Sequence, residues 1–353
     1  MKINVKPFIS LKPKEKILII ALQGIGNALF LFPLIKELVK NFPQNPVDVV
    51  VRNESCRMVL DDGKSVRNFF ILPLRFFSLL YLLKILLNIR SNRYAVSFLA
   101  FPANHPFFNI ISFLCNAKYR VSFDYTWHGK RNLNFLNNLF ISLDKTHDYY
   151  QNLSFLKILG YSETIKLNKY LLPFTVKPCL KTNCIGIHPG SSKDRAMKEK
   201  RWSVKCFREL IMRLSKKNFK ILLFFGPDED ELKKEFTDLV SAKVLILSGL
   251  KLNETLSYMA GLKLFIANDS GLMNLASAMG KRVLNIAGGP TDPVRTYPVS
   301  KGSFVIFSTI HCYPCRGLKN TGKPFSCIYS KRLCLEEITV DRVETLVNLM
   351  LDK

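Results

Sequence analysis

The stretch LFIANDSGLMNLASAMG, residues 264–280, joins an apolar run to a series of small residues. Its first four residues have the character of a buried strand, and the small residues near its end predict a helix. Asn268, Asp269 and Ser270 lie between the two and are residue types that begin helices. They could form a simple turn and helix cap. They could also form a phosphate seat from the unpaired backbone N–H groups of the helix, with Gly271 permitting close approach of an anion. The two interpretations are compatible.

The rest of the second half repeats this alternation of strand and helix. Short apolar strands that alternate with helices predict a parallel sheet covered on both faces. The expected strands, some with the loop that follows, are 184–192, 219–231, 242–249 and 281–293. The expected helices are 203–217, 231–240 and 252–261.

The first half shows the same pattern from its start. Residues 16–43 predict a strand, a glycine turn and a helix, and 151–160 predict a helix that ends at its glycine. A chain of 353 residues is long enough for two domains. We therefore expect two Rossmann-like α/β domains, 1–175 and 176–353, with a cleft between them and a linker at 171–183. Whether the last helix packs back on the first domain is left open. Further strands are expected at 47–53, 93–101 and 117–125, with a helix between the last two.

The charge of the chain is strongly positive and evenly spread. Residues 1–175 hold 23 Lys and Arg against 10 Asp and Glu, and residues 176–353 hold 29 against 17. Such a field favours an anionic partner, which could be a phosphorylated substrate, an acidic lipid or a nucleic acid. Residues 69–90 are long and apolar enough to suggest a membrane span, but Pro73, Arg75 and Lys84 interrupt them. A half-buried helix, an interfacial contact and a span are all possible readings of this stretch.

The cysteines point to a reducing compartment. There are nine, and an odd number argues against a disulfide framework. The first apolar run, 17–22, is short and follows three lysines, so we expect no signal peptide and a cytoplasmic location. A CxxC pair with two further thiols could bind zinc, form a redox pair or be a loop of free thiols. These four are Cys312, Cys315, Cys327 and Cys334.

Four polar or glycine-rich loops follow strands of the second half. Ligands of parallel sheets bind beyond the carboxyl ends of the strands, so these loops should converge on one rim. Each loop could also be an ordinary turn. They are His188–Ser192, Gly226–Glu231, Asn268–Gly271 and Gly288–Asp292.

Charged residues in and beside these loops suggest a diphosphate ligand. Asp228 or Glu229 could accept hydrogen bonds from ribose hydroxyls, or could favour the start of the next helix. A basic run after the first loop could neutralise a diphosphate leaving group, or could be a solvated face. Its members are Lys193, Arg195, Lys198, Lys200 and Arg201.

The first loop of the chain, LQGIGNALF at 22–30, is only a weak dinucleotide fingerprint. Gly24 and Gly26 are present, but Leu29 takes the place of the third glycine, and no acidic residue ends a strand about 20 residues later. A tight loop facing the predicted cleft remains the expectation.

These motifs, in this order, resemble glycosyltransferase family 9, the heptosyltransferases of lipopolysaccharide core synthesis. The matching segments are HPGSS with EKRW, GPDEDE, NDSGLMNLASAMG, GGPTDP and HCYPCRG with CLEEIT, together with the opening KILIIALQGIGNALFLFPLIKEL. The resemblance implies a GT-B fold with a nucleotide diphosphate sugar donor in the C-terminal domain and a lipid-linked or glycan acceptor in the N-terminal one. It further implies inverting transfer without metal or cofactor, at the cytoplasmic face of the bacterial inner membrane.

The resemblance also assigns roles to individual residues. Lys200 would be the pyrophosphate cation, and Asp228 or Glu229 would hold the ribose. Gly24, Gly26 and residue 27 would face the acceptor. The remaining donor-binding positions are Ser191, Ser192, Asp269, Ser270, Gly271, Leu272 and Asn274.

The chain departs from the family pattern at two of these positions. Asn274 stands where the family commonly has His, which is a mild change because an amide can still donate to a phosphate oxygen. Asn27 stands where the family commonly has the Asp that serves as general base, and an amide cannot accept the acceptor's proton. Asp124, with His128 nearby, is the substitute base that the sequence offers.

Three hypotheses follow from the sequence. The first is a glycosyltransferase that moves a heptose-like sugar. The second is a family member that binds sugar nucleotides but has lost catalysis and acts as an interaction or regulatory partner. The third, nucleic-acid binding, rests on charge alone, and we expect no nucleic-acid partner.

Overall fold

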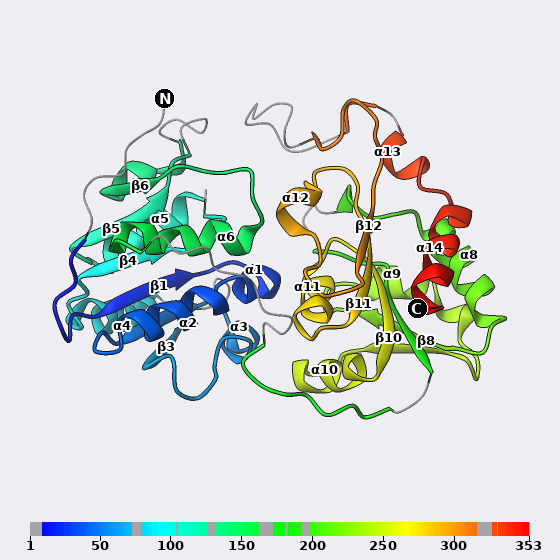
Figure 1. The fold of residues 1–353 in the computed structure, drawn as a ribbon, viewed down its shortest axis with the longest axis horizontal. Coiled ribbons are helices and arrows are strands. Elements are labelled where there is room, and N and C mark those ends of the chain that lie inside the picture. The colour runs from blue at the N-terminus through cyan, green and yellow to red at the C-terminus, as the bar shows by residue number, and fades with distance from the viewer. Residues whose placement is uncertain are drawn as a thin grey trace. The chain divides into compact units, whose positions relative to one another are not determined.

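The computed structural model describes residues 9–72, 79–103, 105–125, 131–161, 172–180, 183–192, 198–315, 327–329 and 331–352. The chain forms two compact units (Figure 1). Unit 1 comprises Met1–Leu167 with Leu172–Phe174, and unit 2 comprises Asn168–Leu171 with Thr175–Lys353. The chain changes from one unit to the other between residues 167 and 175.

Unit 1 is built on a parallel sheet of six strands in the order β3-β2-β1-β4-β5-β6. The order reverses beside β1, which pairs with β2 on one side and with β4 on the other. The strands are β1 Ile17–Ala21, β2 Val47–Val51, β3 Asn68–Ile71, β4 Val96–Leu99, β5 Tyr119–Phe123 and β6 Leu139–Ile141. The predicted strands of the first half are confirmed, while β3 and β6 were not predicted.

Helices cover both faces of this sheet. The helix predicted within 16–43 is two helices, α1 Ile25–Leu29 and α2 Phe32–Asn41. Pro33 lies in the first turn of α2, where a missing N–H costs nothing, so a new helix begins there. The others are α3 Glu54–Met58, α4 Leu79–Ser91, α5 Pro106–Leu114 and α6 Asp148–Leu153, with the 3-10 turns η2 Asn134–Leu136 and η3 Ser154–Leu159. The helix predicted at 151–160 is therefore α6 continued by η3, and Gly160 ends it with a left-handed φ of 81°.

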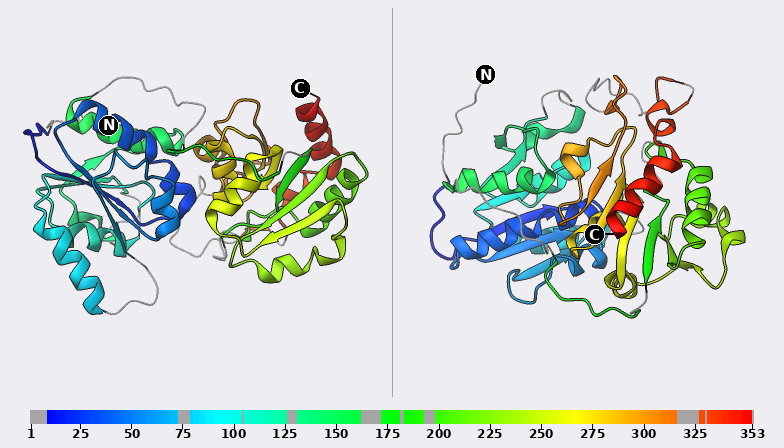
Figure 2. Two further views of the ribbon diagram at one scale, coloured as in Figure 1. Left: turned by 90° about the horizontal axis from the view of Figure 1, so that it is seen from below. Right: turned by 45° about the vertical axis from the view of Figure 1, so that its right-hand side comes forward.

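The apolar stretch 69–90 divides between two elements. Its first residues form β3, and its later ones form the 13-residue helix α4. Leu86 and Ile89 of α4 are buried against Leu18 and Ile20 of β1, so α4 is a half-buried helix. Figure 2 shows α4, in cyan, on the opposite side of the sheet from α2, in blue. Within the described ranges, no helix combines the length and apolar character that crossing a bilayer requires.

Unit 2 repeats the architecture with a second parallel sheet, in the order β12-β11-β10-β7-β8-β9. Its strands are β7 Cys184–His188, β8 Lys220–Phe225, β9 Val244–Ser248, β10 Leu262–Asn268, β11 Arg282–Ile286 and β12 Phe304–Ile306. Its helices are α8 Val204–Ser215, α9 Asp230–Lys234, α10 Leu252–Ala260, α11 Gly271–Ala278, α12 Pro293–Thr296, α13 Leu333–Glu336 and α14 Val340–Leu351. All the strands predicted here are confirmed. The helix predicted at 231–240 is shorter, since α9 ends at Lys234. Phe236 follows and is buried in the core, and the 3-10 turn η4 Thr237–Leu239 comes after it.

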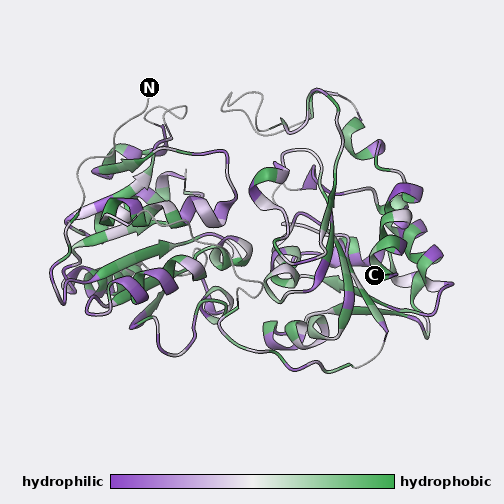
Figure 3. Cartoon of the chain, viewed as in Figure 1, coloured by the Kyte–Doolittle hydropathy of each residue, from purple (hydrophilic) through white to green (hydrophobic). Residues whose placement is uncertain are grey.

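The core of unit 2 lies between this sheet and the pair α8 and α14. Trp202 and Phe207 are buried together there, and Val343 and Val347 bring α14 into the same core. The strands of both sheets are predominantly hydrophobic in Figure 3, as expected for parallel strands buried on two faces. The two parallel α/β units confirm the predicted fold class.

Candidate functional site

The site of unit 2 lies where the strand order reverses. β7 pairs with both β8 and β10, so the loops that follow β7 and β10 diverge at their shared carboxyl ends. Asn268, the last residue of β10, ties these loops together. Its Oδ1 accepts from the backbone N–H of Trp202 at 2.9 Å, and its Nδ2 donates to the carbonyl of Pro189 at 2.8 Å. One buried amide therefore fixes three segments of the rim.

A Ser–His–Glu relay crosses the same rim. Nδ1 of His188 lies 2.9 Å from Oγ of Ser270, and Nε2 lies 3.0 Å from Oε2 of Glu229. A neutral imidazole with its proton on Nε2 satisfies every group, since it donates to the carboxylate and accepts from the serine. All three side chains are buried. The relay joins the ends of β7 and β10 to the loop after β8.

Glu229 is held from several sides. Its Oε2 also accepts from the backbone N–H of Gly226 at 2.7 Å, and Arg201 lies 3.8 Å from its Oε1. Burial acts to raise the pKa of Glu229, but the contacts with His188, Gly226 and Arg201 outweigh it and lower the pKa below its ordinary value. Gly190 leaves room for this carboxylate, because a β-carbon there would lie 1.9 Å from its Oε1.

Lys200 and Asp269 form a second, largely buried pair beside the relay. Their Nζ and Oδ2 atoms are 2.8 Å apart, and the side chains are 10% and 13% exposed. The hydroxyl of Thr291 donates to the same Oδ2 at 3.0 Å. Asp269 thus fixes the position of the ammonium group.

The start of α11 is capped as the simpler interpretation predicts. Oγ of Ser270 accepts from the backbone N–H of Met273 at 3.2 Å. Helix geometry leaves the N–H groups of Gly271 and Leu272 without a partner inside the helix, and both residues are partly exposed. The cap therefore does not use up the donors that a phosphate would need. Asn274, on the next turn, is buried.

The other predicted donor residues occupy different environments. Ser191 is buried, and its Oγ and carbonyl accept from Arg201 at 2.9 and 2.6 Å. Ser192 and Asp228 are exposed at the rim. Lys198 is exposed, whereas Lys193 and Arg195 lie outside the described residues.

In unit 1 the predicted acceptor-side loop follows β1, also where the strand order reverses. Gln23 donates through Nε2 to the carbonyls of Ala100 and Pro102, at 2.6 and 2.9 Å, and so ties this loop to the end of β4. Gly24 is exposed and Gly26 buried, and Asn27 is partly buried on the five-residue α1.

Asp124, the predicted substitute base, directly follows β5 and is partly exposed. Its backbone N–H donates to the carbonyl of Ile141 at 2.8 Å, which places it at the carboxyl edge of the unit 1 sheet. His128 lies outside the described residues.

The cysteine loop contacts the rim at Gly289. All nine cysteines are free thiols in this structure, including the four for which zinc binding, a redox pair and free thiols were the alternatives. Sγ of Cys334 accepts from the backbone N–H of Gly289 at 3.4 Å, and the N–H of Cys315 donates to the Gly289 carbonyl at 3.2 Å. Burial, with a smaller effect of three neighbouring thiols, raises the pKa of Cys315 to about 11. Among the described side chains, no group of three or more His, Cys, Asp or Glu is arranged to hold a metal ion.

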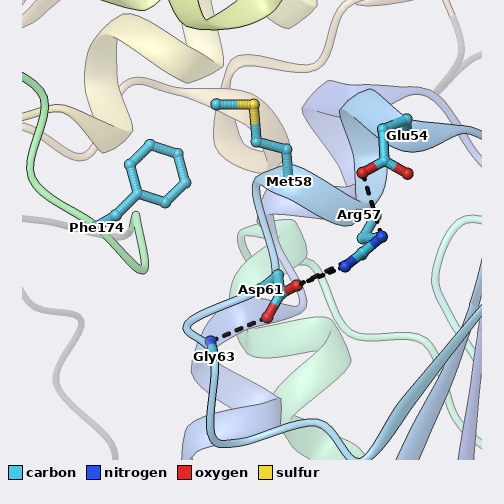
Figure 4. A pocket seen from close by; sticks show the side chains of 6 residues that line it. All are labelled: Glu54, Arg57, Met58, Asp61, Gly63 and Phe174. Carbon is cyan, nitrogen blue, oxygen red and sulfur yellow. Dashed lines mark hydrogen bonds and ion pairs between the residues drawn. The ribbon is translucent and has the colours of Figure 1, made fainter.

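A shallow pocket of about 360 Å³ lies on unit 1 beside α3 (Figure 4). Arg57 lies 3.4 Å from both Glu54 and Asp61, and Asp61 accepts from the N–H of Gly63. The charged groups that line the pocket therefore contact one another. It was not predicted, and it lacks the converging loops of the rim.

The sequence predicted that these loops converge, but it did not predict all of the side-chain contacts between them. The sequence pattern places His188 in a predicted loop but gives it no role, and it does not distinguish Thr291 from other loop residues. A histidine at a strand end, followed by Pro-Gly, is the signal that could have drawn attention to His188. Its partners are 41 and 82 positions away, so spacing alone could not identify them.

The lowered pKa of Glu229 predicts a pH-dependent contribution to stability. A carboxylate with a depressed pKa stabilises the fold above its unfolded pKa, and this contribution is lost as the pH falls through the folded pKa. Glu229→Gln should therefore destabilise unit 2 by about 1.5–3 kcal/mol at pH 7, and by less near pH 4. Chemical denaturation of both proteins at the two pH values measures the difference. An equal loss at both would contradict the charged role.

The two doubly wound units, with loops converging at the switch point of each sheet, define a GT-B protein. The solved structure of the E. coli heptosyltransferase WaaC with ADP matches with a TM-score of 0.72, 18% identity, and coverage of 95% of this chain and 99% of that one. A glycosyltransferase family 9 structure from Veillonella parvula matches with a TM-score of 0.71 at 17% identity, covering 96% and 97%.

The family is shown by sequence. The family model of glycosyltransferase family 9 (heptosyltransferase) matches residues 111–325, so the chain belongs to this family. It is 25% identical over 217 residues to lipooligosaccharide heptosyltransferase 2 of Campylobacter jejuni, covering 58% of this chain and 65% of that protein. It is 33% identical over 129 residues to the Haemophilus ducreyi protein of the same name, covering 35% and 36%. The chain thus matches about a third to two thirds of the length of these curated relatives.

Proposed function

We propose that this protein transfers a heptose-like sugar from a nucleotide diphosphate donor to a lipopolysaccharide-type acceptor, with inversion at the anomeric carbon. The observation that carries the proposal is the pairing of Lys200 with Asp269 next to the start of α11. A buried ammonium group and the backbone N–H groups of Gly271 and Leu272 lie on adjoining parts of one rim, as binding of a diphosphate requires.

The leaving diphosphate is where negative charge develops during transfer. The acceptor hydroxyl attacks the anomeric carbon from the face opposite the diphosphate, and the bond from that carbon to the phosphate oxygen breaks. Lys200 and the first N–H groups of α11 stabilise the departing oxygens. Asp269 keeps Lys200 in place, and its carboxylate does not itself bind phosphate because the charges are alike.

We assign the other donor contacts from the exposure of the side chains at the rim. Asp228 presents its carboxylate at the rim, so it is our candidate for the ribose hydroxyls, while buried Glu229 holds the loop through His188. Ser192 is exposed on the loop after β7, and buried Ser191 shapes that loop through Arg201. The Asn274 amide supplies a further donor on the first turns of α11.

The relatives suggest which donor and acceptor to test first. Related solved structures contain ADP and ADP-2-deoxy-2-fluoro heptose, and the curated relatives are lipooligosaccharide heptosyltransferases. ADP-heptose is therefore the first donor to test, with a lipid-linked core oligosaccharide as acceptor. The acceptor-side loop would be that of Gly24, Gly26 and Asn27. Because such an acceptor is membrane-bound, the protein would work as a peripheral protein at the cytoplasmic face of the inner membrane.

Asn27 favours a second candidate function. An amide cannot take the acceptor's proton, so either Asp124 serves as the base or the protein binds donors without transferring sugar. In the second case it would be an interaction or regulatory partner. Asn27 would orient the acceptor in either case.

A donor panel separates these candidates. A ligand that binds only the native state raises the melting temperature, so ADP-heptose should raise it more than GDP- or UDP-sugars do. Transfer of labelled heptose to a deacylated core oligosaccharide should then be measured with the wild type, Asp124→Asn and Asn27→Asp. Product from the wild type that is lost in Asp124→Asn supports transfer with Asp124 as base. Donor binding without product supports the second candidate, and no binding of any donor contradicts both.

A further inference from the structure

One side of unit 1 carries large apolar side chains that solvent can reach. On α4, Leu80, Leu83 and Leu87 are 78%, 46% and 65% exposed. Their spacing of three and four residues places them on one stripe of the helix. The opposite stripe, with Leu86 and Ile89, is buried in the core against the sheet. The three exposed leucines therefore point away from the unit that α4 covers.

Helix α5 carries a second set of exposed apolar side chains on the same side of the sheet. Its buried residues Ile111 and Cys115 belong to the same core cluster as the buried side of α4, so both helices cover the same face of the sheet. The exposed residues of α5 are large and apolar. We call the six residues together the apolar face: Leu80, Leu83, Leu87, Ile110, Phe113 and Leu114.

The other side of the sheet is different. Among the described residues of unit 1, every large exposed hydrophobic side chain belongs to α4, α5, η2 or β6, and none to α1, α2, α3 or α6. The left view of Figure 2 shows α4 and α2 on the two sides of the sheet. Single exposed leucines are common on protein surfaces, but a concentration on one side marks an interaction surface.

Charge segregates to the same part of the chain. Residues 63–123, which contain α4 and α5, hold eight Lys and Arg and no Asp or Glu, although the whole chain has 27 acidic residues. Lys84 and Arg90 are exposed on α4, and Lys118 is exposed just after α5. The Arg120 guanidinium lies 5.6 Å from the ring centre of Phe113. Cations therefore border the apolar face and no carboxylate from this stretch opposes them.

We infer that the apolar face docks unit 1 on an anionic lipid bilayer. An interfacial helix inserts apolar side chains among the acyl chains, while Lys and Arg reach the phosphates of the headgroups. The surface potential of an anionic leaflet strengthens this attraction. An acid-free stretch of 61 residues matches such a surface. It would place unit 1, which holds the acceptor under the proposed function, against the membrane that carries a lipid-linked acceptor. That last link rests on the proposed function, whereas the docking itself does not.

Flotation of the full-length protein with lipid vesicles tests the inference. The wild type should float with phosphatidylethanolamine vesicles containing about a quarter phosphatidylglycerol, and much less with phosphatidylcholine alone. The variant Leu80→Gln, Leu83→Gln, Leu87→Gln keeps good helix formers on an exposed stripe, so it should fold. Its bound fraction should fall by about tenfold or more. A matched control removes three exposed apolar side chains of unit 2, in Met212→Gln, Val240→Gln, Leu349→Gln, and should float like the wild type.

A second variant tests the charges. Lys84→Gln, Arg90→Gln, Lys118→Gln should weaken flotation on anionic vesicles, whereas Lys205→Gln, Lys263→Gln, Lys301→Gln, exposed lysines of unit 2, should weaken it less. The donor-induced rise in melting temperature should be unchanged in all four variants, which separates failure of docking from failure of the proposed function. Flotation of the leucine variant at the wild-type level would overturn the inference. So would a wild type that does not float, or a dimer in light scattering that the leucine variant converts to monomer without any vesicle binding.

Discussion

Lys200→Ala should lower kcat for sugar transfer by about a hundredfold or more, with a smaller change in KM for the donor. Loss of one strong donor to a developing oxyanion costs this much in other enzymes. Lys200 is nearly buried and is held 2.8 Å from Asp269, so its charge is positioned before the donor arrives. Steady-state kinetics with a saturating acceptor measures the effect.

A neighbouring lysine provides the control for this variant. Lys198 lies on the same segment but is exposed, so Lys198→Ala should change kcat by less than threefold. Lys200→Arg keeps the charge and should restore part of the rate. A Lys200→Ala protein with a normal melting temperature and wild-type kcat would exclude Lys200 from the leaving-group site. If the protein only binds donors, the same variant should instead weaken the rise in melting temperature caused by ADP.

Asp48→Ala should destabilise unit 1 by about 3 kcal/mol or more. Asp48 is fully buried in β2, where it forms a paired contact with the Arg67 guanidinium and accepts from the hydroxyl of Tyr94 at 2.5 Å. The backbone N–H of Asn68 also donates to it, at 3.1 Å. Removal of the carboxylate leaves a buried hydroxyl and a partly buried cation without their partner.

Chemical denaturation of the full chain measures this loss, and hydrogen exchange of β2 assigns it to unit 1. Glu54→Ala is the matched control, because Glu54 is 67% exposed and its contact with Arg57 at 3.4 Å is a surface ion pair. We expect it to change the free energy of unfolding by less than about 0.5 kcal/mol. Because Asp48 belongs to unit 1, donor binding at the rim of unit 2 should be unaffected. A loss below about 1 kcal/mol for Asp48→Ala would show that water or a rearranged side chain replaces the carboxylate.

The sequence predicted most of the fold because its strands are short, apolar and separated by helices with clear start signals. The stretch at 264–280 is an example, with Ser270 capping α11 as its residue type suggests. The three strands that were missed, β3, β6 and β12, are only three or four residues long and lie at or near the sheet edges. Strands this short give too few residues for a pattern, and pairing with the sheet decides them.

The candidate site was predicted less completely. Loop positions follow from topology, so the rim could be placed before any coordinates, whereas the role of Lys200 came from the family resemblance and stays a prediction. Which side chains meet across that rim depends on rotamers and on distances between loops, and no spacing encodes those. Nothing in the sequence distinguished Asp228 from Glu229. The structure buries Glu229 against His188 and leaves Asp228 at the surface.

The absence of a β-carbon at Gly190 has a consequence for how this protein can diverge. Any other residue at that position would occupy the space that Glu229 Oε1 fills, 1.9 Å away. A side chain at position 190 therefore requires the Glu229 carboxylate to move, and His188 would lose this partner in the same event. Among descendants of this chain, a replacement of Gly190 should accordingly be tolerated mainly where residues 188 and 229 have changed as well.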